Sequence, residues 1–170
     1  KHTDPDALLL AEVYNPKLYR DYVHLGKMDY LYDKVDFYDQ MKRIMQGKSD
    51  TTPLVAIQAD YADIEHHLLH FLENHDEQRI ASPEFAGDAC IGMPAMVVSA
   101  TISTAPTLLY FGQEVGEKGE GNPGFGKASR TTIFDYWGVP AHQRWMNDGA
   151  FDGGRSTPDE KQLRAFYSTL

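Results

Sequence analysis

The sequence has a single cysteine, Cys90, and few basic side chains for the number of acidic ones. One cysteine excludes a disulfide within the chain. Because Cys90 lies in an apolar stretch, we expect it to be a small buried residue. Lys and Arg number 16 against 25 Asp and Glu, which leaves a formal charge of −9. This charge repels phosphate backbones, so we expect no nucleic-acid partner.

Long hydrophobic runs are also missing. The most apolar window, residues 86–104, contains Asp88, Gly92, Pro94 and several hydroxyl side chains. This window is too polar and too short to span a bilayer, so we expect no membrane partner. The remaining composition, with 42% hydrophobic and 24% charged residues, is that of an ordinary globular protein.

The chain alternates short apolar runs with amphipathic ones. The apolar runs predict buried strands at residues 7–13, 28–32, 68–72 and 107–111. The segments between and after them predict helices at residues 15–24, 33–46, 52–62, 88–104 and 157–170. Residues 115–154 are rich in glycine and predict a long loop, and a loop of this length is usually functional.

Strand–helix repetition is typical of a parallel sheet with right-handed crossovers. Four such units are half of an eight-unit (β/α) barrel, so we expect an α/β fold that forms part of a TIM barrel. An isolated half would leave sheet edges uncovered. We therefore infer that this chain is a fragment or that its partner half comes from elsewhere, and the exposed barrel edges favour self-association.

Two of the predicted strands end in polar residues. Glu12 ends the first apolar run, and the third run leads into Asn74, His75 and Asp76. The carboxyl ends of barrel strands meet at one rim, where they hold side chains with the accuracy that catalysis needs. Two carboxylates at this rim, Glu12 and Asp76, predict acid/base chemistry on a polar substrate.

Three segments resemble motifs of the α-amylase superfamily of glycoside hydrolases (family thirteen). Residues 9–14 are similar to its fifth-strand motif, residues 71–76 to its seventh-strand motif, and residues 106–114 to its eighth strand and the following turn. The resemblance implies that residues 1–170 are one domain, the C-terminal half of the catalytic barrel, comprising roughly strands five to eight with their helices. It also implies that the nucleophilic Asp, on the fourth strand, lies outside this chain.

The resemblance implies a retaining α-glycosidase that acts on α-glucans or maltooligosaccharides. Retention needs a nucleophile and an acid/base about 5–5.5 Å apart. Glu12 would be the general acid/base, a role that requires it to hold a proton near neutral pH. Asp76 would grip sugar hydroxyls and stabilise the transition state. The residues that the resemblance assigns to substrate binding are Asn74, His75, Tyr14 and Arg79.

The resemblance suggests particular roles for two of these residues, Tyr14 and Arg79. Tyr14 would stack on a neighbouring sugar ring, and Arg79 would either orient a carboxylate or line a subsite. The resemblance implies no metal and no cofactor in this fragment, since the calcium ligands of many members lie mostly in other parts of the full-length protein.

Two alternatives stay open. A transglycosylase of the same superfamily would share these motifs and differ only in its product. A non-catalytic carbohydrate-binding barrel would need no carboxylates, and the presence of Glu12, His75 and Asp76 argues against it.

Other motifs carry competing interpretations. Residues 65–70 contain His66 and His70, which would share a face only if a helix continued that far, and a zinc-protease motif needs Glu directly after its first His. We therefore expect polar surface there. Residues 121–127 resemble a phosphate loop but lack the following Ser or Thr, which favours a plain loop. Residues 130–137 either line the substrate cleft or pack beneath that loop.

Overall fold

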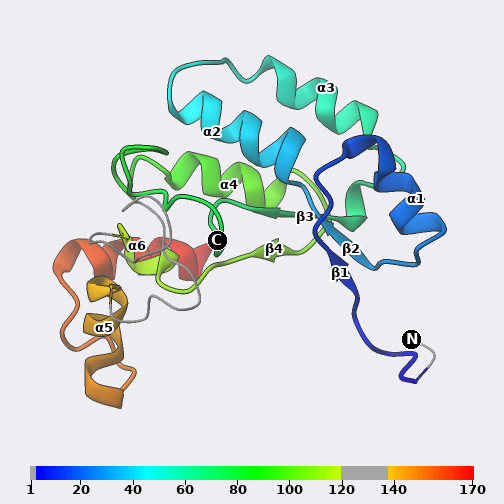
Figure 1. The fold of residues 1–170 in the computed structure, drawn as a ribbon. Coiled ribbons are helices and arrows are strands. Elements are labelled where there is room, and N and C mark those ends of the chain that lie inside the picture. The colour runs from blue at the N-terminus through cyan, green and yellow to red at the C-terminus, as the bar shows by residue number, and fades with distance from the viewer. Residues whose placement is uncertain (1–2, 120–137) are drawn as a thin grey trace. The chain divides into compact units, whose positions relative to one another are not determined.

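A computed structural model of the chain describes residues 3–119 and 138–170. These residues form an α/β fold with a four-stranded parallel sheet in the order β1-β2-β3-β4 and, within the described ranges, six α-helices (Figure 1). The predicted α/β class is confirmed, while its extension to a TIM barrel stays a prediction. The sequence motifs at residues 121–127 and 130–137 lie outside the described residues.

The chain divides into two compact units. Unit 1 holds the described residues of Lys1–Phe71 and Ser99–Thr107, and unit 2 holds those of Leu72–Val98 and Leu108–Leu170. The helix α4 (Met93–Thr101) and the strand β4 (Thr107–Leu108) each continue from one unit into the other along the chain.

Three parallel strands lie in unit 1. They are β1 (Leu10–Ala11), β2 (Tyr30–Tyr32) and β3 (Leu68–Phe71). The predicted strand at residues 7–13 is wrong in its length. Leu8 is 75% exposed and Leu10 43% exposed, and β1 pairs with β2 alone among the described strands. The apolar run at residues 7–13 indicated a buried strand, but in the described part of the chain β1 has one neighbouring strand and its apolar side chains are partly exposed.

The helices of unit 1 begin where the sequence predicts. Asn15 accepts a hydrogen bond from the backbone of Lys17 and caps a 3-10 turn, Pro16–Leu18, that leads into α1 (Tyr19–His24). Asp33 accepts a bond from the backbone of Phe37 and caps the π-helical turn Lys34–Tyr38. That turn continues into α2 (Asp39–Met45), and α3 (Thr52–Asp60) follows.

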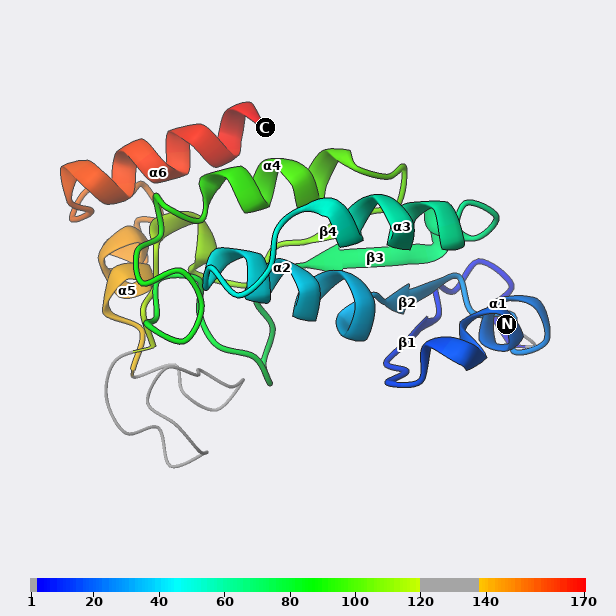
Figure 2. The same cartoon turned by 90° about the horizontal axis from the view of Figure 1, so that it is seen from above.

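The helices of unit 1 pack on the sheet. The helix α1 contacts β2, and the π-helical turn before α2 contacts both β3 and α3 (Figure 2). The aromatic rings of Tyr38 and Phe71 stack with their centroids 4.9 Å apart. One apolar cluster of unit 1 consists of Val13, Tyr19, Val23, Leu31, Tyr61, Ile64 and Leu68.

Unit 2 contains two further helices, α5 (Pro140–Met146) and α6 (Pro158–Thr169). The capping box predicted for α6 is confirmed, because Thr157 Oγ1 accepts from the backbone of Glu160 and Glu160 Oε2 accepts from the backbone of Thr157. The long loop predicted at residues 115–154 is wrong in part, since α5 lies within it. Seven residues are too few to show a helical period in the sequence.

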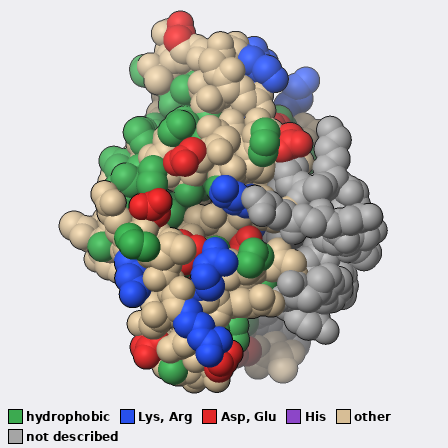
Figure 3. Space-filling model, turned by 90° about the vertical axis from the view of Figure 1, so that its left-hand side faces the viewer, with side chains coloured by type: hydrophobic (Ala, Val, Ile, Leu, Met, Phe, Trp, Pro, Cys, Tyr) green, Lys and Arg blue, Asp and Glu red, His purple; other side chains and the backbone are tan. Residues whose placement is uncertain are grey.

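One other predicted feature of unit 2 needs correction. The helix predicted at residues 88–104 begins only at Met93, because Asp88 Oδ1 accepts from the backbones of Cys90 and Ile91 and holds a turn there. In the described ranges, every helix is too short or too polar to cross a membrane. Figure 3 shows acidic, basic and hydrophobic side chains interspersed on one face of the molecule.

Candidate functional site

Glu12 directly follows β1 in unit 1. Its side chain is exposed, and Tyr14 Oη donates a hydrogen bond to its Oε1. Tyr14 is itself 54% exposed, so this pair stands at the surface of unit 1. The phenol therefore orients the carboxylate that the sequence singled out as an acid/base.

Tyr32 is a neighbour of Glu12 that sequence reasoning missed. Ala11 pairs with Leu31, so Glu12, the residue after β1, and Tyr32 of β2 are next in register. Burial raises the pKa of the Tyr32 phenol, and the nearby charge of Glu12 raises it further. Tyr32 therefore stays a neutral phenol beside the carboxylate. Its ring packs against Phe71 at 5.1 Å.

The His-Asp pair lies on a tight turn at the start of unit 2. Asn74 is buried, and its Oδ1 accepts hydrogen bonds from the backbones of Asp76 and Glu77, both at 2.8 Å. An Asn that bonds its own backbone two residues on is a turn-forming residue. His75 Nε2 lies 3.4 Å from Asp76 Oδ2, and both side chains are partly exposed. The turn thus presents His75 and Asp76 together, while sugar binding by Asn74 stays a prediction.

A buried ion pair closes the base of this turn. Arg79 Nη1 donates to Glu73 Oε2 at 2.8 Å and to the carbonyl oxygen of Phe111 at 2.7 Å. The backbone of Ile80 donates to Glu73 Oε1 at 2.7 Å. Glu73 precedes the turn, and Arg79 and Ile80 follow it. We call these contacts the Glu73–Arg79 clamp.

The clamp lies in an apolar and aromatic setting. The Arg79 guanidinium lies 4.7 Å from the ring centroid of Tyr110 and 4.9 Å from that of Phe111. Burial raises the pKa of Glu73, whereas the charge and hydrogen bond of Arg79 oppose that rise. Because Arg79 is fully buried, the carboxylate that it orients here is that of Glu73. The role of Arg79 in a subsite stays a prediction.

A second turn follows β4. Gly112 begins it with a φ of +82°, and a side chain at this position would approach Glu117 Cβ to 3.2 Å. Gln113 is buried, with its Oε1 accepting from the backbone of Tyr110 and its Nε2 lying 3.3 Å from Tyr167 Oη. The turn that resembles the family's eighth-strand motif is therefore anchored by an amide side chain inside unit 2.

His66 and His70 do not share a helix face. His70 lies on β3, buried, with Nδ1 3.2 Å from the Ser99 carbonyl oxygen and Nε2 3.6 Å from Asp33 Oδ2. His66 lies in the 3-10 turn Glu65–His67 that precedes the strand. The zinc-like spacing therefore does not form a helical ligand pair. The expectation of polar surface at residues 65–70 is wrong for His70, because β3 buries it.

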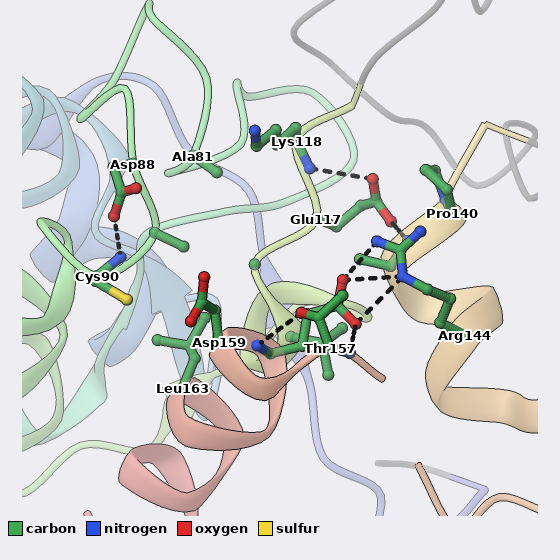
Figure 4. A pocket seen from close by; sticks show the side chains of 15 residues that line it. Ala81, Asp88, Cys90, Glu117, Lys118, Pro140, Arg144, Thr157, Asp159 and Leu163 are labelled. Carbon is green, nitrogen blue, oxygen red and sulfur yellow. Dashed lines mark hydrogen bonds and ion pairs between the residues drawn. The ribbon is translucent and has the colours of Figure 1, made fainter. Parts of the chain in front are cut away.

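A cavity of about 370 Å³ lies elsewhere in unit 2, and neither His75 nor Asp76 lines it. Figure 4 shows Asp88, Cys90 and Asp159 on one side of it. Cys90 is exposed, so the prediction that it is buried is wrong. Cys90 lies on the turn that Asp88 holds, and apolar neighbours in the sequence do not by themselves show that a residue is buried.

The Cys90 thiol does not make this cavity a nucleophilic site. Removal of the Cys90 thiol from water raises its pKa, and the charges of Asp88 and Asp159 raise it further. A protonated thiol is a poor nucleophile. On the opposite wall, the buried Glu117 accepts from the backbones of Ala141 and His142 and caps α5 (Figure 4). Its carboxylate is thereby used in holding the fold.

The candidate site residues belong to both units. Glu12 and Tyr14 lie in unit 1, and Asn74, His75 and Asp76 lie in unit 2. The strands β1 and β3 are parallel members of one sheet, with β2 between them, so they end at the same edge. The convergence of Glu12 and Asp76 on one sugar stays a prediction.

No protein-family model and no curated protein sequence matches the chain. The assignment to a family therefore depends on the three motifs and on the chemistry of their residues.

Proposed function

We propose that the chain is the C-terminal half of the catalytic barrel of an α-amylase-type glycoside hydrolase, acting with retention on α-glucans or maltooligosaccharides. One observation carries this proposal. Glu12 follows β1 directly and Glu73 to Asp76 follow β3 after one apolar residue, and the carboxyl ends of these parallel strands lie at one edge of the sheet. This is the edge on which (β/α) barrels build their active sites. The four strands would then be strands five to eight of the barrel.

In this mechanism Glu12 protonates the leaving oxygen and later takes a proton from water. Tyr14 holds the Glu12 carboxyl through its hydrogen bond, and Tyr32 supplies a neutral phenol beside it. The nucleophile is an Asp on a strand that precedes β1 in the assembled barrel. Glu12 is exposed in unit 1, so substrate and the other half of the barrel would have to cover it.

Asp76 and His75 would bind hydroxyl groups of the sugar on which the nucleophile acts. Their turn is held from within by Asn74 and at its base by the Glu73–Arg79 clamp. A catalytic group gains from such support because small displacements of a reacting group cost rate steeply. The clamp would thus be the element that fixes Asp76 relative to the bound sugar.

The assignment of Glu12 is tested by azide rescue in the assembled barrel, which means this chain together with the strands that carry the nucleophile. With an activated leaving group, Glu12→Ala should form the glycosyl-enzyme but lack the base for its hydrolysis. Added azide should then restore turnover and give a glycosyl azide of α configuration, because two inversions restore the configuration of the substrate.

Asp76→Asn is the matched control, and azide should not rescue it. A β-configured azide from Glu12→Ala would make Glu12 the nucleophile, and an absence of rescue would remove it from the acid/base role. The 170-residue chain alone should show no turnover of maltoheptaose, and measurable turnover by it would contradict the proposed division of residues. Saturable binding of maltoheptaose to an assembled barrel that shows no turnover would favour a carbohydrate-binding barrel instead.

A further inference from the structure

A second hollow in unit 2 contains none of the candidate site residues. It has a volume of about 270 Å³ and lies among α5, α6 and the segment 152–156. One face of α6 lines it through Lys161, Arg164 and Ser168, which are spaced three and four residues apart. Trp145 of α5 and Ser156 complete the wall. The hollow is thus built mainly on regular helix, which gives it fixed geometry.

Arg164 enters this hollow with an unused donor. Its guanidinium carbon lies 4.9 Å from the ring centroid of Trp145, so the aromatic ring contacts the face of the guanidinium. Stacking leaves the donors on the guanidinium edge free. The Nε atom is buried and has no hydrogen-bond partner among the described residues. A buried donor on a guanidinium group is nearly always hydrogen-bonded, so we expect an acceptor to bind here.

Ser156 supplies a second unused polar atom in the same hollow. The residue is 9% exposed, and its Oγ is buried without a hydrogen-bond partner in the described part of the chain. Its backbone nitrogen already donates to the Gly153 carbonyl at 3.0 Å. The hydroxyl is therefore the group left for a ligand, and it lies on the wall that Arg164 also lines.

The hollow is lined by two cations, Arg164 and Lys161, and by two carboxylates, Asp152 and Glu160. Lys161 adds a second cation on the same helix face. The two acids of the wall are already engaged: Asp152 Oδ1 accepts from Asn147 and from the backbone of Gly154, and Glu160 pairs with Arg144. A guanidinium edge, an ammonium and a hydroxyl can together bind more oxygens than a carboxylate has. A tetrahedral oxyanion matches them better.

We propose that this hollow is a binding site for a phosphate group, either inorganic phosphate or the phosphate end of a small phosphomonoester. Arg164 donates from its Nε edge, Ser156 donates from its hydroxyl, and Lys161 contributes a point charge. A volume of about 270 Å³ leaves room for no more than a small group attached to the phosphate. The site is independent of the proposed glycosidase function.

The experiment is a titration of the 170-residue chain with inorganic phosphate, followed through the arginine Nε–H signals in nitrogen–proton NMR at constant ionic strength. One such signal should shift and saturate, and it should be missing from the spectrum of Arg164→Gln. The dissociation constant should rise at least tenfold in Arg164→Gln and severalfold in Ser156→Ala. Lys48→Gln, which removes an exposed cation of unit 1, should bind as the unmodified chain does.

Arg164→Lys keeps the charge and removes the guanidinium edge, so it should also weaken binding, and it decides the question if Arg164→Gln does not fold. Tighter binding of a hexose phosphate than of inorganic phosphate would identify a phosphomonoester as the ligand, and equal binding would identify phosphate itself. A response that grows linearly without saturation, or full binding by both Arg164→Lys and Ser156→Ala, would overturn the proposal.

Discussion

Arg79 Nη1 donates a hydrogen bond to Glu73 Oε2 over 2.8 Å, and both side chains are inaccessible to solvent. These two residues flank the turn that carries His75 and Asp76. The same guanidinium nitrogen also bonds the carbonyl oxygen of Phe111, shortly after β4. One buried cation thereby ties together the two segments of unit 2 that follow β3 and β4.

Removal of one partner of the Glu73–Arg79 clamp should lower the free energy of unfolding strongly. Arg79→Met leaves the Glu73 carboxylate buried without its partner, and we expect the free energy of unfolding to fall by about 3–5 kcal/mol. Glu73→Gln combined with Arg79→Met removes the stranded charge and should cost less than Arg79→Met alone. Urea unfolding of the three proteins measures this. A double variant that is as unstable as Arg79→Met, or less stable, would show that the two side chains do not act as a pair.

Acid should weaken unit 1 through Asp63. Arg20 Nε and Nη2 both donate to this carboxylate at 2.8 Å, and the hydrogen bond from Arg20 lowers the pKa of Asp63 below its ordinary value of 3.8. A carboxyl with a lowered pKa stabilises the fold above that ordinary value and loses this contribution as the pH falls through the folded-state pKa. Unfolding free energies between pH 2 and 6 should therefore fall less steeply in Asp63→Asn than in the unmodified chain. Parallel curves for the two proteins would contradict this.

Cys90 should be accessible yet slow to react. Its thiol is exposed, but its pKa is raised by removal from water and by the charges of Asp88 and Asp159. Alkylation by iodoacetamide, followed by mass spectrometry, should be slower at pH 7.5 than that of a free cysteine peptide. Asp159→Asn removes the weakest of these causes and should speed the reaction about two- to threefold. An unmodified chain that reacts as fast as the peptide would refute this explanation.

The exposed start of the sheet should promote association. Leu8 and Leu10 are 75% and 43% exposed, and β1 is an edge strand of the described sheet. Exposed apolar edges are templates for pairing with another chain, and lysine is a common means of blocking them. We expect Leu8→Lys to shift the sedimentation coefficient of the chain toward that of a monomer. Leu25→Lys, at another exposed leucine of unit 1, is the control and should leave it unchanged.

Local features of this chain were predictable because their causes are local. Asn15 before Pro16 and Thr157 before Pro158 both start helices as the sequence predicts, since a cap needs only residues within one turn. The parallel sheet followed from the alternation of apolar runs. The helix α5 was missed because its seven residues are too few to show a helical period.

The features that sequence reasoning missed depend on contacts between distant residues. Tyr32 is close to Glu12 only because β1 and β2 pair in a particular register. Arg79 reaches Phe111 across 32 residues of chain, and nothing in the spacing of the two predicts that bond. Cys90 has apolar neighbours in sequence but lies on a turn held by Asp88. Side-chain packing, rather than pattern, decides such positions.

A crystal structure of the assembled barrel with a bound maltooligosaccharide would show whether Glu12 and Asp76 act on one sugar. We expect the Glu12 carboxyl within hydrogen-bond distance of a glycosidic oxygen, and Asp76 hydrogen-bonded to hydroxyls of the ring on one side of that same oxygen. A complex with the two carboxyls on different sugars, or with the oligosaccharide bound away from both, would contradict this expectation.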